Sequence, residues 1–316
     1  MRPAELNLPA GRTRRRPPAH PRLDLDRDGA HWPNREASRL VRAGGVRWHV
    51  QQMGTGPDVL LVHGTGASTH SFGALALELA GRFRVTACDL PGHGFTDRLP
   101  SARMTLPGMS DALADLLAAL DVRPAVAVGH SAGAAILIRM CLDGRIAPRV
   151  VVSLNGALSG FRGPIGRFFS PLAQMLALNP LVPRVFARRA RDPAVLANLV
   201  ERTGSRLSPD QVALYGRLAA DPDHVSAALA MMAGWDLGAL QAGYARLKTP
   251  VVLVAGSRDG MVPADQVFDL ERRIPHARAV VLRGLGHLAH EEAPEAIAAV
   301  IESAAREHGA LPEAGP

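Results

Sequence analysis

Short, continuous apolar runs alternate with segments of helical periodicity along most of this chain. DVLLV at 58–62, AVAVG at 125–129 and PVVLVAG at 250–256 are bounded by turn residues, which is typical of strands buried on both faces. LPGMSDALADLLAALD at 106–121 has the pattern of an amphipathic helix. Strand–helix alternation of this kind predicts an α/β fold, with a mostly parallel central sheet and helices on both faces.

Further segments continue this rhythm at both ends of the chain. Two β-rich runs at 39–44 and 46–51 predict a hairpin around Gly44 and Gly45. The remaining expected strands are 83–88, 150–156 and 278–284, and the remaining expected helices are 72–80, 132–144, 264–274 and 292–305.

The expected domain organisation follows from the places where the alternation stops. Residues 157–240 are mostly helical in pattern and contain several prolines, so we interpret them as a helical cap over the carboxyl edge of the sheet. The core is then formed by residues 31–156 and 241–305. Residues 1–30 are rich in Pro, Arg and Asp without apolar periodicity, which predicts a disordered basic leader, and residues 306–316 are expected to be a flexible tail.

Composition limits the classes of partner and compartment. The formal charge is +7, but Lys248 is the only lysine, which indicates a coding bias toward arginine rather than selection for phosphate contacts. Much of the excess charge lies in residues 1–22, so we expect no nucleic-acid partner. Cys88 and Cys141 do not suggest a disulfide framework, and no apolar signal segment or membrane span is visible. A cytoplasmic location is expected.

The most specific local signal is Gly129-His130-Ser131-Ala132-Gly133, which stands between a buried strand and an apolar helix. The pattern G-x-S-x-G places a serine on a strained strand-to-helix turn, where neighbouring backbone leaves no room for side chains at the flanking glycines. The helix that follows points its first amides at a reacting oxygen. We therefore predict Ser131 as a nucleophile, and a tight turn with a surface serine is the alternative.

A serine hydroxyl needs a base, and the chain order on this kind of sheet is serine, then acid, then histidine. Asp259 lies in the loop after a late strand, and His287 lies in a glycine-rich loop before the last helix. We predict that Asp259 orients His287 and that His287 is the base. The alternatives are a helix cap for the aspartate and a surface position for the histidine. His290 is the fallback base, and Asp236 and Asp265 are the fallback acids.

Backbone amides complete the predicted catalytic set. The segment HGTG at 63–66 follows the first buried strand, where a loop can offer an N–H group to an oxyanion. We expect the amides of Thr65 and Ala132 to form this oxyanion hole, and a glycine turn without a role is the alternative. Asp89 and His93 are interpreted as structural. No spacing of histidine, cysteine and carboxylate side chains is typical of a metal site, so neither a metal nor another cofactor is expected.

The cap offers apolar residues that could line a substrate cavity, and packing of the cap on the sheet is the alternative. The candidate pocket residues are His130, Asn155, Phe161 and Trp235. Further apolar side chains that could line the cavity are Phe168, Phe169, Met175, Met231 and Met232. An arginine cluster in the cap favours either a solvated helix face or contact with propionates or anionic lipid headgroups, and it comprises Arg184, Arg188, Arg189 and Arg191.

Over residues 38–305 the chain resembles the α/β-hydrolase superfamily, on HGTG, DLPGHG at 89–94, GHSAG, the Asp259 loop and His287. Within it, longer segments resemble the magnesium-chelatase accessory proteins of bacteriochlorophyll biosynthesis. These segments are HWPNREASR at 31–39, HGTGASTHSF at 63–72, SLNGAL at 153–158, SPLAQMLALNPLVPRVFA at 170–187, TGSRL at 203–207, ALAMMAGWDL at 228–237 and GLGHLAHEEAPE at 284–295.

The resemblance implies an α/β-hydrolase fold with a helical cap and a role near the insertion of Mg²⁺ into protoporphyrin IX in a photosynthetic bacterium. It also implies a small-molecule ligand such as a porphyrin, and magnesium-chelatase subunits as partners. Three functions stay open at this point. They are a serine hydrolase that acts as an accessory factor in this pathway, a non-catalytic chaperone that binds porphyrin or the chelatase, and a general carboxylesterase or haloperoxidase-like enzyme.

Overall fold

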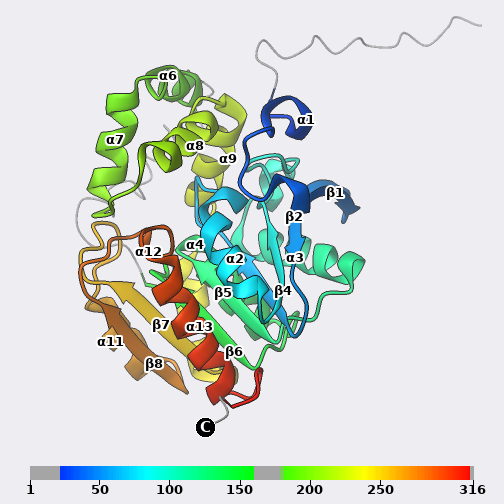
Figure 1. Ribbon diagram of the computed structural model, residues 1–316, viewed down its shortest axis with the longest axis vertical. Coiled ribbons are helices and arrows are strands. Elements are labelled where there is room, and N and C mark those ends of the chain that lie inside the picture. The colour runs from blue at the N-terminus through cyan, green and yellow to red at the C-terminus, as the bar shows by residue number, and fades with distance from the viewer. Residues whose placement is uncertain (1–21, 160–178, 180, 314–316) are drawn as a thin grey trace, which may run out of the picture.

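The computed structural model describes residues 22–159, 179 and 181–313. These residues form an eight-stranded sheet with the order β1-β2-β4-β3-β5-β6-β7-β8 (Figure 1). The strands are β1 (Ser38–Ala43), β2 (Val46–Met53), β3 (Asp58–Val62), β4 (Arg84–Cys88), β5 (Val126–His130), β6 (Val150–Leu154), β7 (Val251–Gly256) and β8 (Ala277–Leu282).

The sheet is parallel from β4 to β8, and only the β1–β2 and β2–β4 pairs are antiparallel among the described residues. The hairpin between β1 and β2 turns at Gly44 and Gly45, whose φ angles are 56° and 78°. Positive φ at both central residues gives the turn whose twist matches paired strands, and glycine adopts it without steric cost. The α/β class and the mostly parallel sheet are therefore confirmed.

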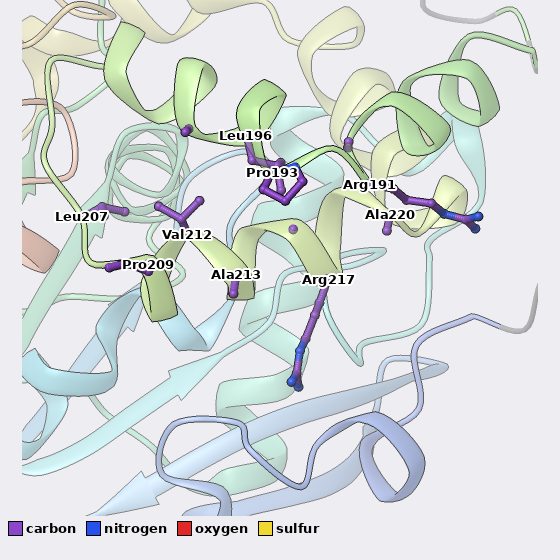
Figure 2. Close-up of a pocket in the computed structure, with 12 residues that line it drawn as sticks. Arg191, Pro193, Leu196, Leu207, Pro209, Val212, Ala213, Arg217 and Ala220 are labelled. Atoms are coloured by element: carbon purple, nitrogen blue, oxygen red, sulfur yellow. The ribbon is translucent and has the colours of Figure 1, made fainter.

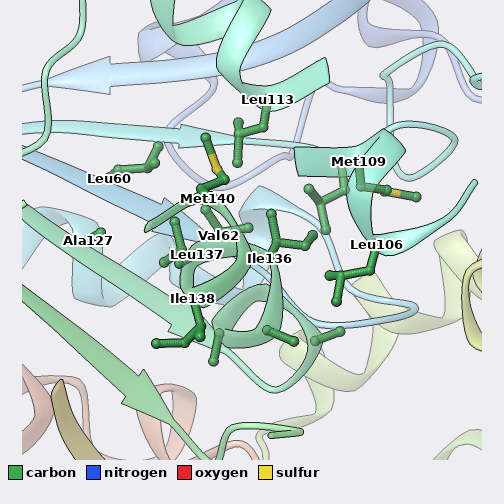
Figure 3. Close-up of a cluster of buried hydrophobic side chains, with 14 of the residues drawn as sticks. Leu60, Val62, Leu106, Met109, Leu113, Ala127, Ile136, Leu137, Ile138 and Met140 are labelled. Carbon is green, nitrogen blue, oxygen red and sulfur yellow. The ribbon is translucent and has the colours of Figure 1, made fainter. Parts of the chain in front are cut away.

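Helices cover both faces of the sheet, each over its own apolar layer. Alternate residues of β3 divide between the layers, with Leu60 and Val62 in one and Val59 and Leu61 in the other. The first layer lies under α3 (Leu106–Leu120), α4 (Ala132–Leu142) and α11 (Gln266–Arg273), and Figure 3 shows part of it. The second lies under α2 (Gly73–Ala80) and α13 (Pro294–Glu307). The short α12 (Ala289–Glu292) precedes α13.

Between β6 and β7 the described chain is helical, and Figure 1 shows α6 to α9 gathered at one end of the sheet. The helices are α6 (Leu181–Arg189), α7 (Pro193–Arg202), α8 (Pro209–Ala219), α9 (Pro222–Ala233) and α10 (Leu237–Gln241). Pro193, Pro209 and Pro222 begin helices instead of breaking them. Asp192, Ser208 and Asp221 cap the first turns of α7, α8 and α9, and a proline follows each cap, where its missing N–H costs nothing.

The ordered chain extends further at both ends than the sequence predicts. Residues 22–30, assigned to the disordered leader, contain α1 (Leu25–Asp28), because Leu25 is buried with Trp32 and Phe95 in a small cluster. In the tail, α13 continues to Glu307 and Ala310 is buried. Single apolar residues without periodicity gave no signal of this packing. None of the helices in the described ranges is long and apolar enough to cross a membrane.

Candidate active site

Ser131 occupies the turn between β5 and α4 with a φ of 49° and a ψ of −112°. Non-glycine residues rarely adopt such a backbone conformation, and they persist in it where the surroundings enforce it. A Cβ on Gly129 would lie 2.5 Å from the amide nitrogen of Ala134, and one on Gly133 would lie 2.0 Å from the carbonyl oxygen of Val62. The two glycines thus allow the turn to press against β3 and α4, and the Ser131 side chain is left half-buried at the carboxyl end of β5.

Asp259 and His287 lie in the loops after β7 and β8, and they are hydrogen-bonded to each other. The distance from His287 Nδ1 to Asp259 Oδ2 is 2.8 Å, and the carboxylate is fully buried. Its other oxygen, Oδ1, accepts the backbone N–H groups of Met261 at 2.7 Å and Val262 at 2.9 Å. Such a fixed carboxylate holds the imidazole in the tautomer whose Nε2 is free to accept a proton.

Asn155 and His130, expected from the sequence to line a pocket, contact the acid and the backbone of the base loop. Asn155 Nδ2 donates to Asp259 Oδ2 at 2.7 Å and to the carbonyl oxygen of Gly286 at 3.3 Å. His130 Nε2 lies 3.0 Å from the carbonyl oxygen of His287, so this nitrogen carries the proton. Both side chains are buried because they fill the space behind the base loop. This role was missed because the sequence does not show which residue stands behind the acid.

The nucleophile turn and the base loop meet at one edge of the sheet. The ring of His130, which precedes Ser131, lies 4.8 Å from the ring of His287 by their centroids. In the described residues, no hydrogen bond joins Ser131 Oγ to His287 Nε2. Catalytic hydrogen bonds are often long without substrate and tighten when it binds. The structure therefore brings Asp259 and His287 into contact and places the Ser131 turn next to them.

The HGTG segment after β3 borders the nucleophile, as the proposed oxyanion role requires. A Cβ built on Gly64 would lie 3.0 Å from the Cβ of Ser131. His63 fixes the loop, because its Nε2 accepts the N–H of Leu90 at 2.8 Å and its Nδ1 donates to the carbonyl oxygen of Gly64 at 2.7 Å. Burial lowers the pKa of His63 to about 3, so this donor–acceptor pattern is stable. Ala132 begins α4, so its amide lacks an intrahelical acceptor.

Asp89 organises the loop after β4 and takes no part in the triad. Its carboxylate accepts the amides of Thr69 at 2.7 Å and Phe95 at 2.9 Å, and it lies 2.8 Å from His49 Nδ1. Burial alone would raise the pKa of Asp89, but His49 and these donors hold it well below its usual range. Asp89 is fully buried and links its own loop to β2 and to the turn at Thr69, in agreement with the structural role assigned to it.

A histidine of the cap, His224 on α9, connects the cap to both loops beside the site. Its Nδ1 accepts the N–H of Gly94 at 3.1 Å, and its Nε2 lies 3.1 Å from the carbonyl oxygen of Gly66. Burial lowers the pKa of His224 to about 3, so the neutral ring keeps this pattern over a wide pH range. Thr65 Oγ1 also meets Met231 Sδ of α9 at 3.8 Å. No sequence signal marked His224, because its partners lie far away along the chain.

The fallback residues have other positions. Asp236 caps α10 by accepting the amides of Gly238 and Ala239, and Asp265 stands at the start of α11. His290 is fully buried against the ring of His130, with a centroid distance of 4.5 Å. Burial lowers the pKa of His290 to about 3.

A second buried group lies where α12 meets α8. Tyr215 Oη donates to Glu291 Oε1 at 2.6 Å, and the ring of His70 packs edge-on against Tyr215 at 4.5 Å. Burial raises the pKa of Glu291 to about 8, although the hydrogen bond from Tyr215 opposes the shift. The carboxyl group of Glu291 is therefore largely protonated at neutral pH in the folded protein.

The remaining pocket predictions have mixed outcomes. Trp235 is half-buried and packs against the core, which leaves a role in ligand binding untested. Met231 is fully buried in the core, and Phe161 lies outside the described residues. Side chains of the described residues form no group of three or more His, Cys, Asp or Glu that could hold a metal ion.

A cavity of about 620 Å³ lies within the cap, between α7 and α8. Leu196 of α7 and Val212 of α8 contribute to its mainly apolar lining, and Arg191 and Arg217 stand at its border (Figure 2). The lining includes none of the three candidate catalytic residues, so the hollow and the predicted active site are separate features of the described structure.

Comparison with known proteins agrees with this fold. The profile described as "Alpha/beta hydrolase family" matches residues 59–300, so the chain belongs to the alpha/beta hydrolase family. Among curated relatives, the "Magnesium-chelatase 30 kDa subunit" of Rhodobacter capsulatus is 39% identical over 274 residues, which are 86% of this chain and 95% of that protein. The resemblance seen in the sequence is thereby confirmed.

More distant relatives include esterases. The "Pimeloyl-[acyl-carrier protein] methyl ester esterase" of Aeromonas hydrophila is 26% identical over 273 residues, covering 80% of this chain and 97% of that protein. Among solved structures, an "alpha/beta hydrolase fold protein from Burkholderia ambifaria" has a TM-score of 0.71 at 26% identity, covering 90% of this chain and 99% of that chain.

Proposed function

We propose that this protein is a serine hydrolase with Ser131 as nucleophile, His287 as general base and Asp259 as the acid that orients the base. His287 Nε2 takes the proton of the Ser131 hydroxyl as its oxygen attacks an acyl carbon. The amides of Thr65 and Ala132 donate to the oxygen that becomes negative. The protonated His287 then gives its proton to the leaving group, which departs and leaves an acyl group on Ser131. In the second half of the reaction His287 takes a proton from water, the water oxygen attacks the acyl carbon, and His287 returns the proton to the Ser131 oxygen as the acid is released.

The observation that carries this proposal is the built environment of the base. The 2.8 Å contact between His287 Nδ1 and Asp259 is backed by Asn155 and by two backbone amides on the same carboxylate. Burying a carboxylate is costly unless it is fully hydrogen-bonded. This hydrogen-bonded carboxylate lies near Ser131, which is held at positive φ. Packing of the core alone requires neither the buried carboxylate nor the strained serine.

We further propose that the protein acts as an accessory factor for Mg²⁺ insertion into protoporphyrin IX during bacteriochlorophyll biosynthesis. Support comes from the 39% identity to the chelatase subunit of Rhodobacter capsulatus, which extends over 95% of that protein. In this role Mg²⁺ is cargo of the pathway, the small-molecule ligand is a porphyrin, and subunits of magnesium chelatase are the partners. The cytoplasm is the proposed location.

Two other functions have support of their own. A non-catalytic chaperone for porphyrin or chelatase fits the likeness to the chelatase subunit of Rhodobacter capsulatus, which does not by itself require a nucleophile. A carboxylesterase or haloperoxidase-like enzyme outside the pathway fits the likeness to the esterase of Aeromonas hydrophila. The chaperone differs from our proposal because it needs no nucleophile, and the general enzyme differs because it needs no chelatase partner.

Complementation with Ser131→Ala distinguishes these functions. We expect the natural gene, but not Ser131→Ala, to restore bacteriochlorophyll in a Rhodobacter capsulatus strain that lacks the homologous gene. Full restoration by Ser131→Ala would favour the chaperone, and unchanged pigment in the deletion strain would favour the general esterase. Ser159→Ala, a half-buried serine outside the motif, is the matched control.

Two measurements on purified protein complete the test. A fluorophosphonate should label the natural protein at Ser131 and leave Ser131→Ala unlabelled. A porphyrin absorbance titration of folded Ser131→Ala then shows whether ligand binding survives without the nucleophile. Absence of labelling in the natural protein would contradict the hydrolase mechanism.

A further inference from the structure

Helix α6 of the cap turns its large apolar side chains outward. Leu181 is 59% exposed, Val185 is 56% exposed and Phe186 is 39% exposed. The residues that α6 buries are the smaller Pro183 and Ala187. A surface helix normally does the reverse, with its large apolar side chains in the core. Packing among the residues that the structure describes therefore does not account for the exposed face of α6.

The same face is strongly basic. Four exposed arginines lie on α6 and just after it, namely Arg184, Arg188, Arg189 and Arg191. In the parts of the chain that the structure describes, none of these guanidinium groups forms a salt bridge. The sequence holds no aspartate or glutamate between Asp143 and Asp192, so α6 carries no acidic side chain of its own, and the adjacent Asp192 caps α7. The face combines apolar area with uncompensated positive charge.

Helical geometry places these side chains in a defined order. At about 100° per residue, Leu181 and Val185 fall in the middle of the exposed arc. Arg184 and Arg188 flank them on one side and Arg189 on the other, and the exposed Phe186 lies about 60° beyond Arg189. An apolar centre between two cationic margins is the pattern of a helix that lies in a membrane interface, where the arginines reach toward headgroups while the apolar side chains enter the acyl boundary.

We propose that this face of α6 docks the cap onto an anionic lipid bilayer. The helix has nine residues, so it is about 14 Å long and cannot span a hydrocarbon core of about 30 Å. It would lie flat on the bilayer. Charge complementarity selects anionic over zwitterionic lipid, since basic residues near such a surface each contribute favourable energy.

This position would bring the lipid surface close to the candidate active site. Helix α6 packs on α9, and His224 of α9 contacts Gly66 in the loop beside Ser131. An apolar ligand held in the bilayer would thus reach the cap without crossing water. Membrane docking does not depend on the proposed chemistry, so a failure of one leaves the other standing.

Vesicle co-sedimentation of the full chain tests the proposal. We expect binding to phosphatidylcholine vesicles that contain phosphatidylglycerol, weak binding to pure phosphatidylcholine, and a decrease as salt shortens the Debye length from about 10 Å to about 3 Å. In Arg184→Glu/Arg188→Glu the affinity for these vesicles should fall on the order of fivefold for each positive charge removed.

The apolar variant Val185→Asp/Phe186→Asp is the sharper test. The arginines of residues 1–16 would also attract anionic vesicles, but this variant leaves that segment unchanged, so only the α6 face predicts a loss of at least tenfold. Leu77→Asp, at a leucine of α2 that is 58% exposed, controls for loss of an exposed apolar residue. Arg42→Glu/Arg123→Glu controls for the change in net charge.

Several results would overturn the proposal. They are no vesicle binding by the natural chain, full binding by Val185→Asp/Phe186→Asp, or equal losses in the control variants. An acidic protein partner is the rival occupant of this face, and capture of such a partner without any vesicle binding would also count against the bilayer. Circular dichroism of each variant shows that the helices remain folded.

Discussion

The side-chain amide of Asn155 donates to Asp259 Oδ2 at 2.7 Å, the same oxygen that His287 Nδ1 contacts at 2.8 Å. Asn155 follows β6 with a φ of 48°, a conformation that asparagine tolerates better than most residues. This turn directs its amide toward the end of β7. Three neighbouring strands, β6, β7 and β8, thus each supply one member of a connected group: amide, carboxylate and imidazole.

We predict that Asn155→Ala slows the labelling of Ser131 by a fluorophosphonate about tenfold, because one hydrogen bond to a charged acceptor contributes about 1.5 kcal/mol. The second-order rate constant of labelling is the measurement. Asn198→Ala is the control, since that side chain bonds only the carbonyl oxygen of Ala194 on an exposed helix. Equal rates for natural protein and Asn155→Ala would show that the amide does not position the acid.

Replacing the acid should have a much larger effect. In Asp259→Asn an amide can no longer hold the imidazole in the tautomer that leaves Nε2 free, so labelling should fall by about 1000-fold or more. Asp236→Asn is the matched control, because this fallback acid only caps α10. If Asp236→Asn were the slower variant, the assignment of the acid would be wrong.

Gly133, the second glycine of the nucleophile turn, leads to a prediction about stability. In Gly133→Ala the new methyl group would meet the carbonyl oxygen of Val62 at 2.0 Å, so we expect the free energy of unfolding to fall by about 3 kcal/mol or more. Gly81→Ala is the counterpart, with nothing within 4 Å and an ordinary negative φ of −68°, and it should be neutral or raise stability by about 0.5 kcal/mol. Urea unfolding measures both, and similar losses would contradict the turn geometry.

Glu291 predicts a pH dependence of stability. Its pKa is raised by burial from an ordinary 4.5 to about 8, so between these values the unfolded chain has released a proton that the folded chain still holds. Stability from this group is complete below pH 4.5 and is lost as pH rises toward 8, with a slope of at most about 1.4 kcal/mol per pH unit.

Urea unfolding at several pH values measures this slope. Glu291→Gln should reduce it, because glutamine keeps an acceptor for Tyr215 and cannot ionise. Glu36→Gln, at an exposed glutamate, should leave the slope unchanged. A slope that persists in Glu291→Gln would assign the pH dependence to another group.

The strands and the order of the chemical motifs could be predicted because they depend on local pattern. The run at 58–62 coincides with β3, since continuous apolar residues bounded by turns leave few alternatives. The strand expected at 150–156 ends earlier, at Leu154, because Asn155 turns away with positive φ to reach Asp259. The helix expected at 292–305 begins at Pro294, where proline suits the first turn.

By itself the sequence determined the α/β class, the positions of the strands and the serine turn, because apolar period and glycine spacing act between neighbours in the chain. Only the tertiary structure decided that Asn155 and His130 stand behind the base, that His224 connects the cap to the loop at Gly66, and that Glu291 is buried against Tyr215. These contacts join residues 76 to 158 positions apart. The packing of whole elements sets such contacts, and no local pattern records them.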